Sequence, residues 1–224
     1  MKLLSLIIIM SGLISSNTQA QVCGENEPAY CTPQVFRSLE KPITDRILRA
    51  HVFKVGQVTL AGLAIGVSSA NSVKNLAMQN STASDQEGYC TWYVNRGNVF
   101  AWWNFNYKYL PHPSSQASEQ IISQYMSLAA PLFDQGMNNF VTCAQKHRYI
   151  SVGCNGMKHR GPTLFGMLLA YSGCKASNAT AIVNEFWGLN GVAPEVRLAI
   201  IEAASRLGKA NQTQSCRLRQ MLEN

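Results

Sequence analysis

The chain has 224 residues, of which 46% are hydrophobic and 14% charged, so it is long enough for one sizeable core and is not a disordered chain. No apolar heptad and no three-residue glycine period runs through it, which excludes coiled-coil and collagen-like classes. The 19 Lys and Arg outnumber the 12 Asp and Glu, giving a net charge of +7. This mildly basic balance favours anionic partners, but it is too sparse for a dedicated DNA-binding protein.

Residues 1–20 have the features of a signal peptide. Lys2 is followed by an apolar stretch that ends near Ile14, and small residues precede a cleavage position after Ala20. An uncleaved anchor is the alternative, although the apolar stretch is shorter than the about 20 residues of a spanning helix. We therefore expect an exported chain, periplasmic or extracellular, with no transmembrane span after cleavage.

Export changes the interpretation of the cysteines, because most cysteines pair in an oxidising compartment. All seven lie beyond the predicted cleavage position: Cys23, Cys31, Cys90, Cys143, Cys154, Cys174 and Cys216. The number is odd, so at least one thiol stays free or pairs with another molecule, for instance through an intermolecular disulfide. The short spacing of Cys23 and Cys31 suggests a small N-terminal loop, but connectivity cannot be deduced from spacing.

The N-terminal part predicts an irregular arm at residues 21–42 and then helices. Thr44 and Asp45 can cap a helix over residues 44–52. The apolar stretch at 55–70 predicts a tightly packed core helix. Residues 80–88 form a polar linker. This linker divides the chain into an arm with helices at 21–88 and a second part at 89–224, although 21–224 can also form a single domain.

An aromatic segment follows at residues 89–113. Within it, aromatic and polar residues alternate with the period of a β-strand, in a hairpin that turns near residues 95–98. Exposed aromatic rings beside amides suit sugar binding or a protein partner, whereas a buried strand that anchors the core is the structural alternative. The aromatic residues proposed for binding are Trp103, Phe105, Tyr107 and Tyr109.

The C-terminal half shows regular helical signals. Apolar residues at helical spacing, in segments that begin at a proline or a capping residue, predict helices at 115–129, 131–144, 162–173, 177–188 and 194–208, and the last three of these end at a glycine. We therefore expect a mainly α protein, a helical bundle with a small aromatic-rich β-hairpin, stabilised by disulfides.

The tandem basic motif is the first candidate site. The triplet Lys-His-Arg occurs twice, twelve residues apart and each time shortly after a cysteine. Two such triplets on one loop can hold an anionic group, since arginine offers a planar fork and lysine a point charge. A solvated, disulfide-braced loop is the alternative. The proposed binding residues are Lys146, Arg148, Lys158 and Arg160.

The same region also holds residue types that bind zinc, namely Cys143, His147, Cys154 and His159. Their spacing fits a zinc site poorly, and exported cysteines tend to oxidise before they bind metal. No Walker loop, dinucleotide fingerprint or His-Glu-x-x-His motif occurs. We therefore expect neither a metal nor a cofactor.

Cys90 is the candidate nucleophile. The stretch Gly-Tyr-Cys-Thr-Trp-Tyr-Val at 88–94 resembles the segment around the catalytic cysteine of CHAP-type amidases, secreted enzymes that cleave peptidoglycan peptides. The resemblance implies a thiolate at Cys90 that transfers its proton to a histidine, His147 or His159. A structural disulfide at Cys90 is the alternative.

These observations favour a non-enzymatic role. We expect an exported binding or assembly component of the cell envelope, for instance a subunit of a secretion or surface complex. Its partners are expected to be other envelope proteins or anionic or glycan polymers. The alternative is a cysteine amidase or peptidase that acts on cell-wall peptides through Cys90 and a histidine.

Overall fold

The structure is a computed structural model of the chain. It describes residues 23–41, 50–64, 90–94, 98–101, 105–108, 137–154 and 156–224, with a few isolated positions between 119 and 136. The predicted signal peptide, the predicted linker and most of the predicted helix at 115–129 lie outside these residues.

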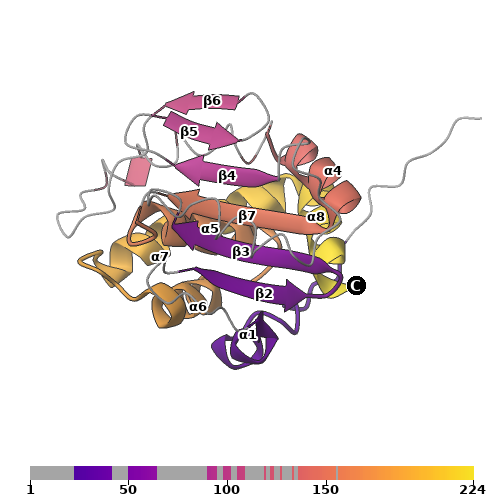
Figure 1. Cartoon of the computed structure of the whole chain (residues 1–224), viewed down its shortest axis with the longest axis horizontal. Helices are drawn as coiled ribbons and strands as arrows, with labels where there is room; N and C mark the ends of the chain where they lie inside the picture. The colour runs from indigo at the N-terminus through magenta and orange to yellow at the C-terminus, as the bar shows by residue number, and fades with distance from the viewer. Residues whose placement is uncertain are drawn as a thin grey trace, which may run out of the picture.

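A mixed β-sheet of seven strands runs through the described part of the chain (Figure 1). The strands are β1 (Glu40–Lys41), β2 (His51–Val55), β3 (Val58–Ala64), β4 (Thr91–Val94), β5 (Asn98–Ala101), β6 (Phe105–Lys108) and β7 (Tyr149–Cys154). Their order in the sheet is β1-β2-β3-β7-β4-β5-β6. The inner strands β3, β7 and β4 are parallel, and antiparallel neighbours extend the sheet on both sides. β3 and β4, from either side of the predicted linker, therefore pair with the same central strand.

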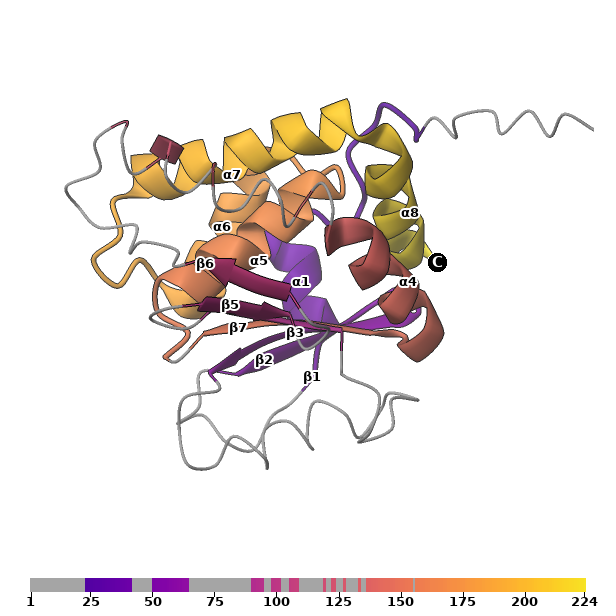
Figure 2. The same ribbon diagram turned by 90° about the horizontal axis from the view of Figure 1, so that it is seen from above.

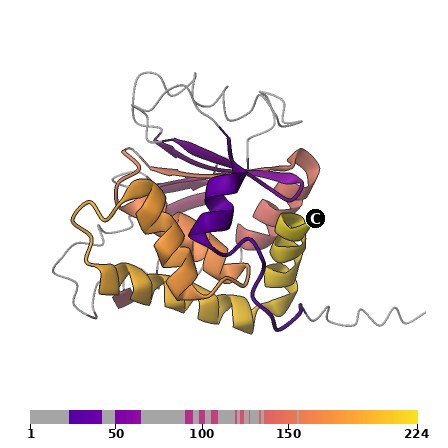
Figure 3. The same cartoon turned by 90° about the horizontal axis from the view of Figure 1, so that it is seen from below.

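The helices gather on one face of this sheet. They are α1 (Pro33–Leu39), α4 (Met137–His147), α5 (Arg160–Tyr171), α6 (Ala176–Trp187), α7 (Pro194–Ala210) and α8 (Gln212–Glu223). Figures 2 and 3 show α1, α5, α6 and α7 on the same side of the strands. α5 packs on β3 and β7 and contacts α6 and α7 on its other sides. None of the described helices is long and apolar enough to cross a membrane.

The helices predicted for the N-terminal part are wrong where the structure describes them. Residues 51–55 and 58–64 form the antiparallel hairpin of β2 and β3, joined by Gly56 and Gln57. Gly56 has a φ of 54°, where glycine is favoured, and a Cβ there would lie 2.8 Å from the backbone oxygen of Leu222. The sheet is therefore larger than the small hairpin expected from the sequence.

Other expectations are confirmed. The predicted helices at 162–173, 177–188 and 194–208 correspond to α5, α6 and α7, and α4 forms the later part of the predicted helix at 131–144. β4 and β5 pair antiparallel on either side of the predicted turn, whose residues 95–97 lie outside the described part of the chain, and β6 falls within the predicted aromatic segment. The helical, disulfide-braced character of the fold was thus foreseen, whereas the extent of the sheet was not.

Three disulfides brace the described part of the chain, and two of them tie the N-terminal arm to the C-terminal region. The pairs are Cys23–Cys216, Cys31–Cys174 and Cys90–Cys143. The small loop expected between Cys23 and Cys31 is therefore wrong, because Cys23 pairs with Cys216 of α8 and Cys31 with Cys174 in the loop between α5 and α6. The arm is also not wholly irregular, since Thr32 caps α1 by accepting a hydrogen bond from the Val35 amide.

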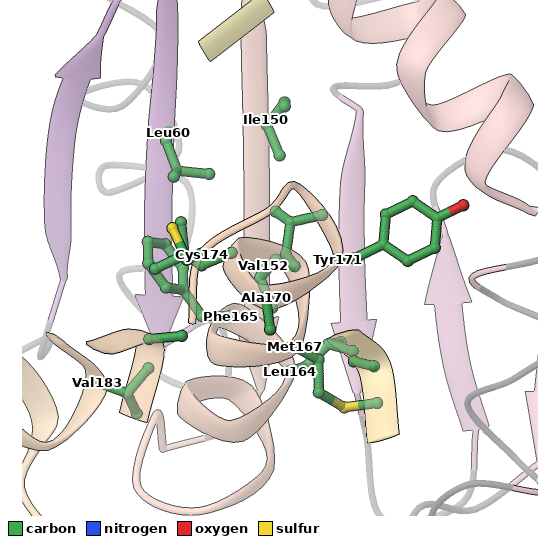
Figure 4. Close-up of a cluster of buried hydrophobic side chains, with 14 of the residues drawn as sticks. Leu60, Ile150, Val152, Leu164, Phe165, Met167, Ala170, Tyr171, Cys174 and Val183 are labelled. Atoms are coloured by element: carbon green, nitrogen blue, oxygen red, sulfur yellow. The ribbon is translucent and has the colours of Figure 1, made fainter. Parts of the chain in front are cut away.

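Aromatic and aliphatic side chains fill the space between the sheet and α5. Figure 4 shows Leu60 of β3 and Val152 of β7 together with the apolar residues of α5. The ring of Phe165 lies 6.0 Å from that of Phe53 and 4.9 Å from that of Trp187, in the range of aromatic pairing. This packing fixes α5, and with it the loop that joins α5 to β7.

Candidate functional site

The two basic triplets lie at opposite ends of the central strand. The first ends α4 and runs into β7, and the second follows β7 and opens α5. β7 has six residues, so at about 3.3 Å per residue the triplets are separated by roughly 20 Å. The hypothesis that both triplets share one anion-binding loop is therefore wrong.

The first triplet contributes to a basic surface at the start of β7. Arg148 is exposed and has a φ of 51°, and its carbonyl accepts a hydrogen bond from the Thr59 amide. Burial, followed by the positive charges of Lys41 and Arg148, lowers the pKa of Lys54. The charge of Arg148 thus acts on Lys54 of β2, whereas His147 is buried at the end of α4.

The second triplet lies where the parallel strands end. β3, β7 and β4 all finish at this edge of the sheet, at Ala64, Cys154 and Val94. Ligands of open sheets with parallel strands bind outside the carboxyl ends of those strands. The adjoining first turn of α5 adds the positive end of a helix dipole.

Glycine allows the loop between β7 and α5 to fold tightly. A Cβ at Gly161 would lie 2.4 Å from the Met157 sulfur and 3.0 Å from the Cys154 sulfur. Gly161 therefore lets the first turn of α5 approach the end of β7 more closely than any other residue would. The basic triplet is held directly above the strand ends as a result.

His159 is a neutral imidazole within this cluster. Its Nε2 lies 2.9 Å from the Asn190 carbonyl oxygen, which can only accept, so Nε2 carries the proton. Burial lowers the pKa of His159, and the positive charges of Arg197, Lys158 and Arg160 lower it further, against the opposing effect of the Asn190 hydrogen bond. The pKa thus lies below the ordinary value of 6.5, and a bound anion would raise it.

Arg197 of α7 lies beneath the loop and is fully buried. Its Nη1 donates to the Asn184 side-chain oxygen and, at 2.9 Å, to the Gly188 carbonyl. Its Nη2 lies 3.5 Å from the carbonyl oxygens of Lys158 and Leu189. Through these acceptors Arg197 connects α6 to the loop, and its positive charge adds to burial in lowering the pKa of His159.

Sequence reasoning found the second triplet but missed Arg197. The sequence does contain a signal for it. Residues 197, 201, 204 and 208 recur at helical spacing, and apart from Arg197 they are apolar or glycine. An arginine on an apolar stripe indicates a buried guanidinium with specific acceptors. Its acceptors at the end of α6 have no signature in the sequence.

Cys90 is paired with Cys143 of α4, with Cα atoms 5.6 Å apart, and only 3% of Cys90 is exposed. A disulfide sulfur is not a thiolate, so the oxidised chain has no nucleophile at this position. Cys90 therefore forms the structural disulfide that was the alternative to a catalytic role. The hypothesis of an amidase that uses Cys90 with His147 or His159 has no thiolate to attack the substrate.

The zinc hypothesis loses a ligand in the same way, because Cys143 is oxidised. The described residues contain no group of three or more His, Cys, Asp or Glu side chains placed to hold a metal ion. Within the described residues Cys154 is the free cysteine, and it is buried at the end of β7. Cys154, the unpaired member of the seven cysteines, is therefore too buried in this structure to form an intermolecular disulfide.

The aromatic residues proposed for binding fall at one edge of the sheet. Phe105 and Tyr107 belong to β6, the last strand in the sheet order. Trp103 and Tyr109 lie outside the described residues. The structure therefore gives the position of the aromatic strand without testing sugar binding by its side chains.

Comparison with protein-family models, with curated proteins and with solved structures finds no match to this chain. The resemblance to CHAP-type amidases is confined to the seven residues around Cys90, and the cysteine at its centre is oxidised. Function must therefore be inferred from the geometry of the cluster at the start of α5.

Proposed function

We propose that this protein is an exported binding component of the cell envelope that holds an anionic group at the carboxyl ends of β3, β7 and β4. One observation carries the proposal. Lys158 and Arg160 lie at the start of α5, Arg197 Nη2 lies 3.5 Å from the Lys158 carbonyl oxygen, and, after burial, the positive charges of all three lower the pKa of His159 between them. A concentration of positive charge at a helix N-terminus favours an anion.

The chemistry of the cluster suits a phosphate or a carboxylate. Lys158 is exposed and can reach a ligand as a point charge, whereas Arg160 and Arg197 are buried and supply fixed positive potential. His159 can accept a proton when the anion binds. The free cysteine beside this cluster, Cys154, is buried at the end of β7, and Cys90 is held in a disulfide, so the exposed chemistry of the cluster is that of its cations and supports binding.

Export is supported by the state of the cysteines. Six of the seven are paired, which is usual for proteins of oxidising compartments and rare in the cytosol. This agrees with the signal-peptide features of the first 20 residues.

Lys158→Ala is expected to weaken the binding of inorganic pyrophosphate by about tenfold, because it removes one charge-assisted contact. The measurement is isothermal titration calorimetry at low salt with the oxidised protein. Lys209→Ala is the matched control, since Lys209 is an exposed lysine in the last turn of α7 and its loss changes net charge equally. Equal effects of the two substitutions, or no binding by the unmodified chain, would contradict the proposed site.

The binding of pyrophosphate is also expected to depend on pH through His159. Protonation of His159 adds a positive charge, and this occurs below pH 6.5 because the pKa of His159 is lowered. After correction for the titration of pyrophosphate itself, affinity should increase as the pH falls through this range. His159→Gln should remove that increase, and its persistence would show that another group is responsible.

A further inference from the structure

The loop between α6 and α7 contains a tight turn with the sequence Asn-Gly at its centre. The Val192 amide donates to the Leu189 carbonyl at 3.0 Å, and the central residues Asn190 and Gly191 have φ values of 50° and 81°. Positive φ at both central positions is the pattern of a type I′ turn, for which Asn-Gly is a preferred sequence. Asn190 is exposed, so the peptide bond between these two residues lies at the surface.

An exposed Asn-Gly bond is chemically reactive. The Gly191 backbone nitrogen can attack the side-chain carbonyl carbon of Asn190, because glycine has no side chain to hinder the approach. A C–N bond forms and closes a five-membered succinimide ring, the bond to Nδ2 breaks, and Nδ2 leaves as ammonia with the proton of the Gly191 amide. Water then opens the ring at either carbonyl carbon and gives aspartate or isoaspartate. Each product carries a carboxylate where Asn190 carried a neutral amide.

This turn is in direct contact with the basic groups at the start of α5. The Asn190 carbonyl oxygen accepts a hydrogen bond from Nε2 of His159 at 2.9 Å. The Leu189 carbonyl oxygen, one residue earlier, lies 3.5 Å from Arg197 Nη2. The positive charges of Arg197 and Lys158 both act on His159. A carboxylate formed at position 190 is therefore placed beside His159 and among these cations.

We propose that Asn190 is a site of spontaneous deamidation, and that the new carboxylate offsets part of the positive charge around His159. Isoaspartate has the more direct effect, because its peptide chain continues through the former side-chain carbonyl carbon. The oxygen that accepts from His159 then belongs to a carboxylate, and a charge-assisted hydrogen bond replaces a neutral one. Aspartate keeps the backbone of the turn but lacks the amide that donates to the Trp187 carbonyl.

The expected consequence is a gradual loss of anion binding as the protein ages, and this consequence rests on the proposed function. A carboxylate beside the cations repels an anionic ligand, so deamidated protein should bind pyrophosphate about tenfold more weakly. The deamidation itself and its effect on His159 do not depend on that function. They are therefore measured separately, without pyrophosphate.

Incubation of the oxidised full chain at mildly alkaline pH tests the modification. Trypsin then releases residues 176–197, which contain Asn190 together with Asn178 and Asn184, neither of which precedes a glycine. Tandem mass spectrometry should show a gain of about 1 Da at position 190 and none at the other two. An isoaspartyl methyltransferase should label the same peptide. If Asn190 stays intact in the folded chain but converts in the reduced chain in guanidinium chloride, the fold protects it and the inference is wrong.

Variants at position 190 test the effect on the basic groups. Asn190→Asp supplies the aspartate product, and NMR titration should give a higher pKa of His159 in this variant than in the unmodified chain. Asn139→Asp is the matched control, since Asn139 is an exposed asparagine of α4 and its replacement adds the same charge. Equal values of the His159 pKa in the two variants would overturn the effect.

Asn190→Gly separates this inference from the proposed function. Gly-Gly suits the same turn but has no amide to lose, so this variant should keep its affinity for pyrophosphate during incubation while the unmodified chain loses it. Equal losses in both chains would show that another change is responsible. If the fresh chain does not bind pyrophosphate, the proposed function fails, whereas the mass and NMR results still decide whether Asn190 deamidates and acts on His159.

Discussion

Replacing Cys31 and Cys174 together with alanine is expected to lower the free energy of unfolding by about 2–5 kcal/mol. The disulfide joins residues 143 positions apart, and long closed loops lose the most entropy in the unfolded chain. The measurement is urea unfolding of the purified protein without reductant, followed by far-UV circular dichroism.

Contacts around this disulfide explain why its loss should also loosen the docking of the N-terminal arm on the helices. The Tyr30 hydroxyl lies 3.0 Å from the Ser172 hydroxyl, and burial raises the pKa of Tyr30. Glu27 accepts hydrogen bonds from the Lys175 amide at 2.7 Å and from the Asn178 side chain at 2.9 Å, which compensates for the missing side-chain cap of α6. The arm is thus docked on α6 by several contacts that the crosslink keeps together.

Cys154→Ala is the control for this prediction. It removes one buried sulfur but no crosslink, so it should cost only about 1 kcal/mol. A double variant of Cys31 and Cys174 no less stable than Cys154→Ala would contradict the role given to the disulfide.

Arg197→Met is expected to lower the free energy of unfolding by about 3–5 kcal/mol, since each acceptor left buried without a donor costs about 1–3 kcal/mol. The acceptors concerned are the Asn184 side-chain oxygen and the Gly188 carbonyl at the end of α6. Thermal and urea unfolding measure the loss. Arg197→Lys should recover part of it at most, because an ammonium group does not reproduce the planar fork of the guanidinium.

Arg206→Met is the matched control on the same helix. Arg206 is exposed, so its replacement should change stability by no more than about 0.5 kcal/mol. Similar losses at positions 197 and 206 would mean that the hydrogen bonds of Arg197 do not hold the loop and α6 together.

The helices on one face of the sheet could be predicted because their sequences carry explicit boundaries. Pro194 opens α7, and Gly188 ends α6 with a φ of 71°. The hairpin of β2 and β3 was misread as helix, because Val58–Ala64 is an apolar run without the alternation that identifies a strand. The two-residue turn at Gly56 and Gln57 was the signal that could have corrected this interpretation.

The candidate site was predictable only in part. The triplet at 158–160 is visible in the sequence, but its separation from the first triplet depends on six residues that form a buried strand. Disulfide partners lie 53 to 193 positions apart, and no spacing rule identifies such pairs. Long-range packing decides both features, so they emerge only from the folded chain.

Whether this is a binding protein or a cysteine hydrolase depends on the oxidation state of one sulfur. Alkylation of the exported protein without reduction, followed by peptide mass spectrometry, reports every free thiol. We expect crosslinked peptides for Cys23–Cys216, Cys31–Cys174 and Cys90–Cys143, and labelling of Cys154 only after unfolding, because it is 6% exposed. Rapid alkylation of Cys90 in the native protein at neutral pH would contradict this account and favour the hydrolase.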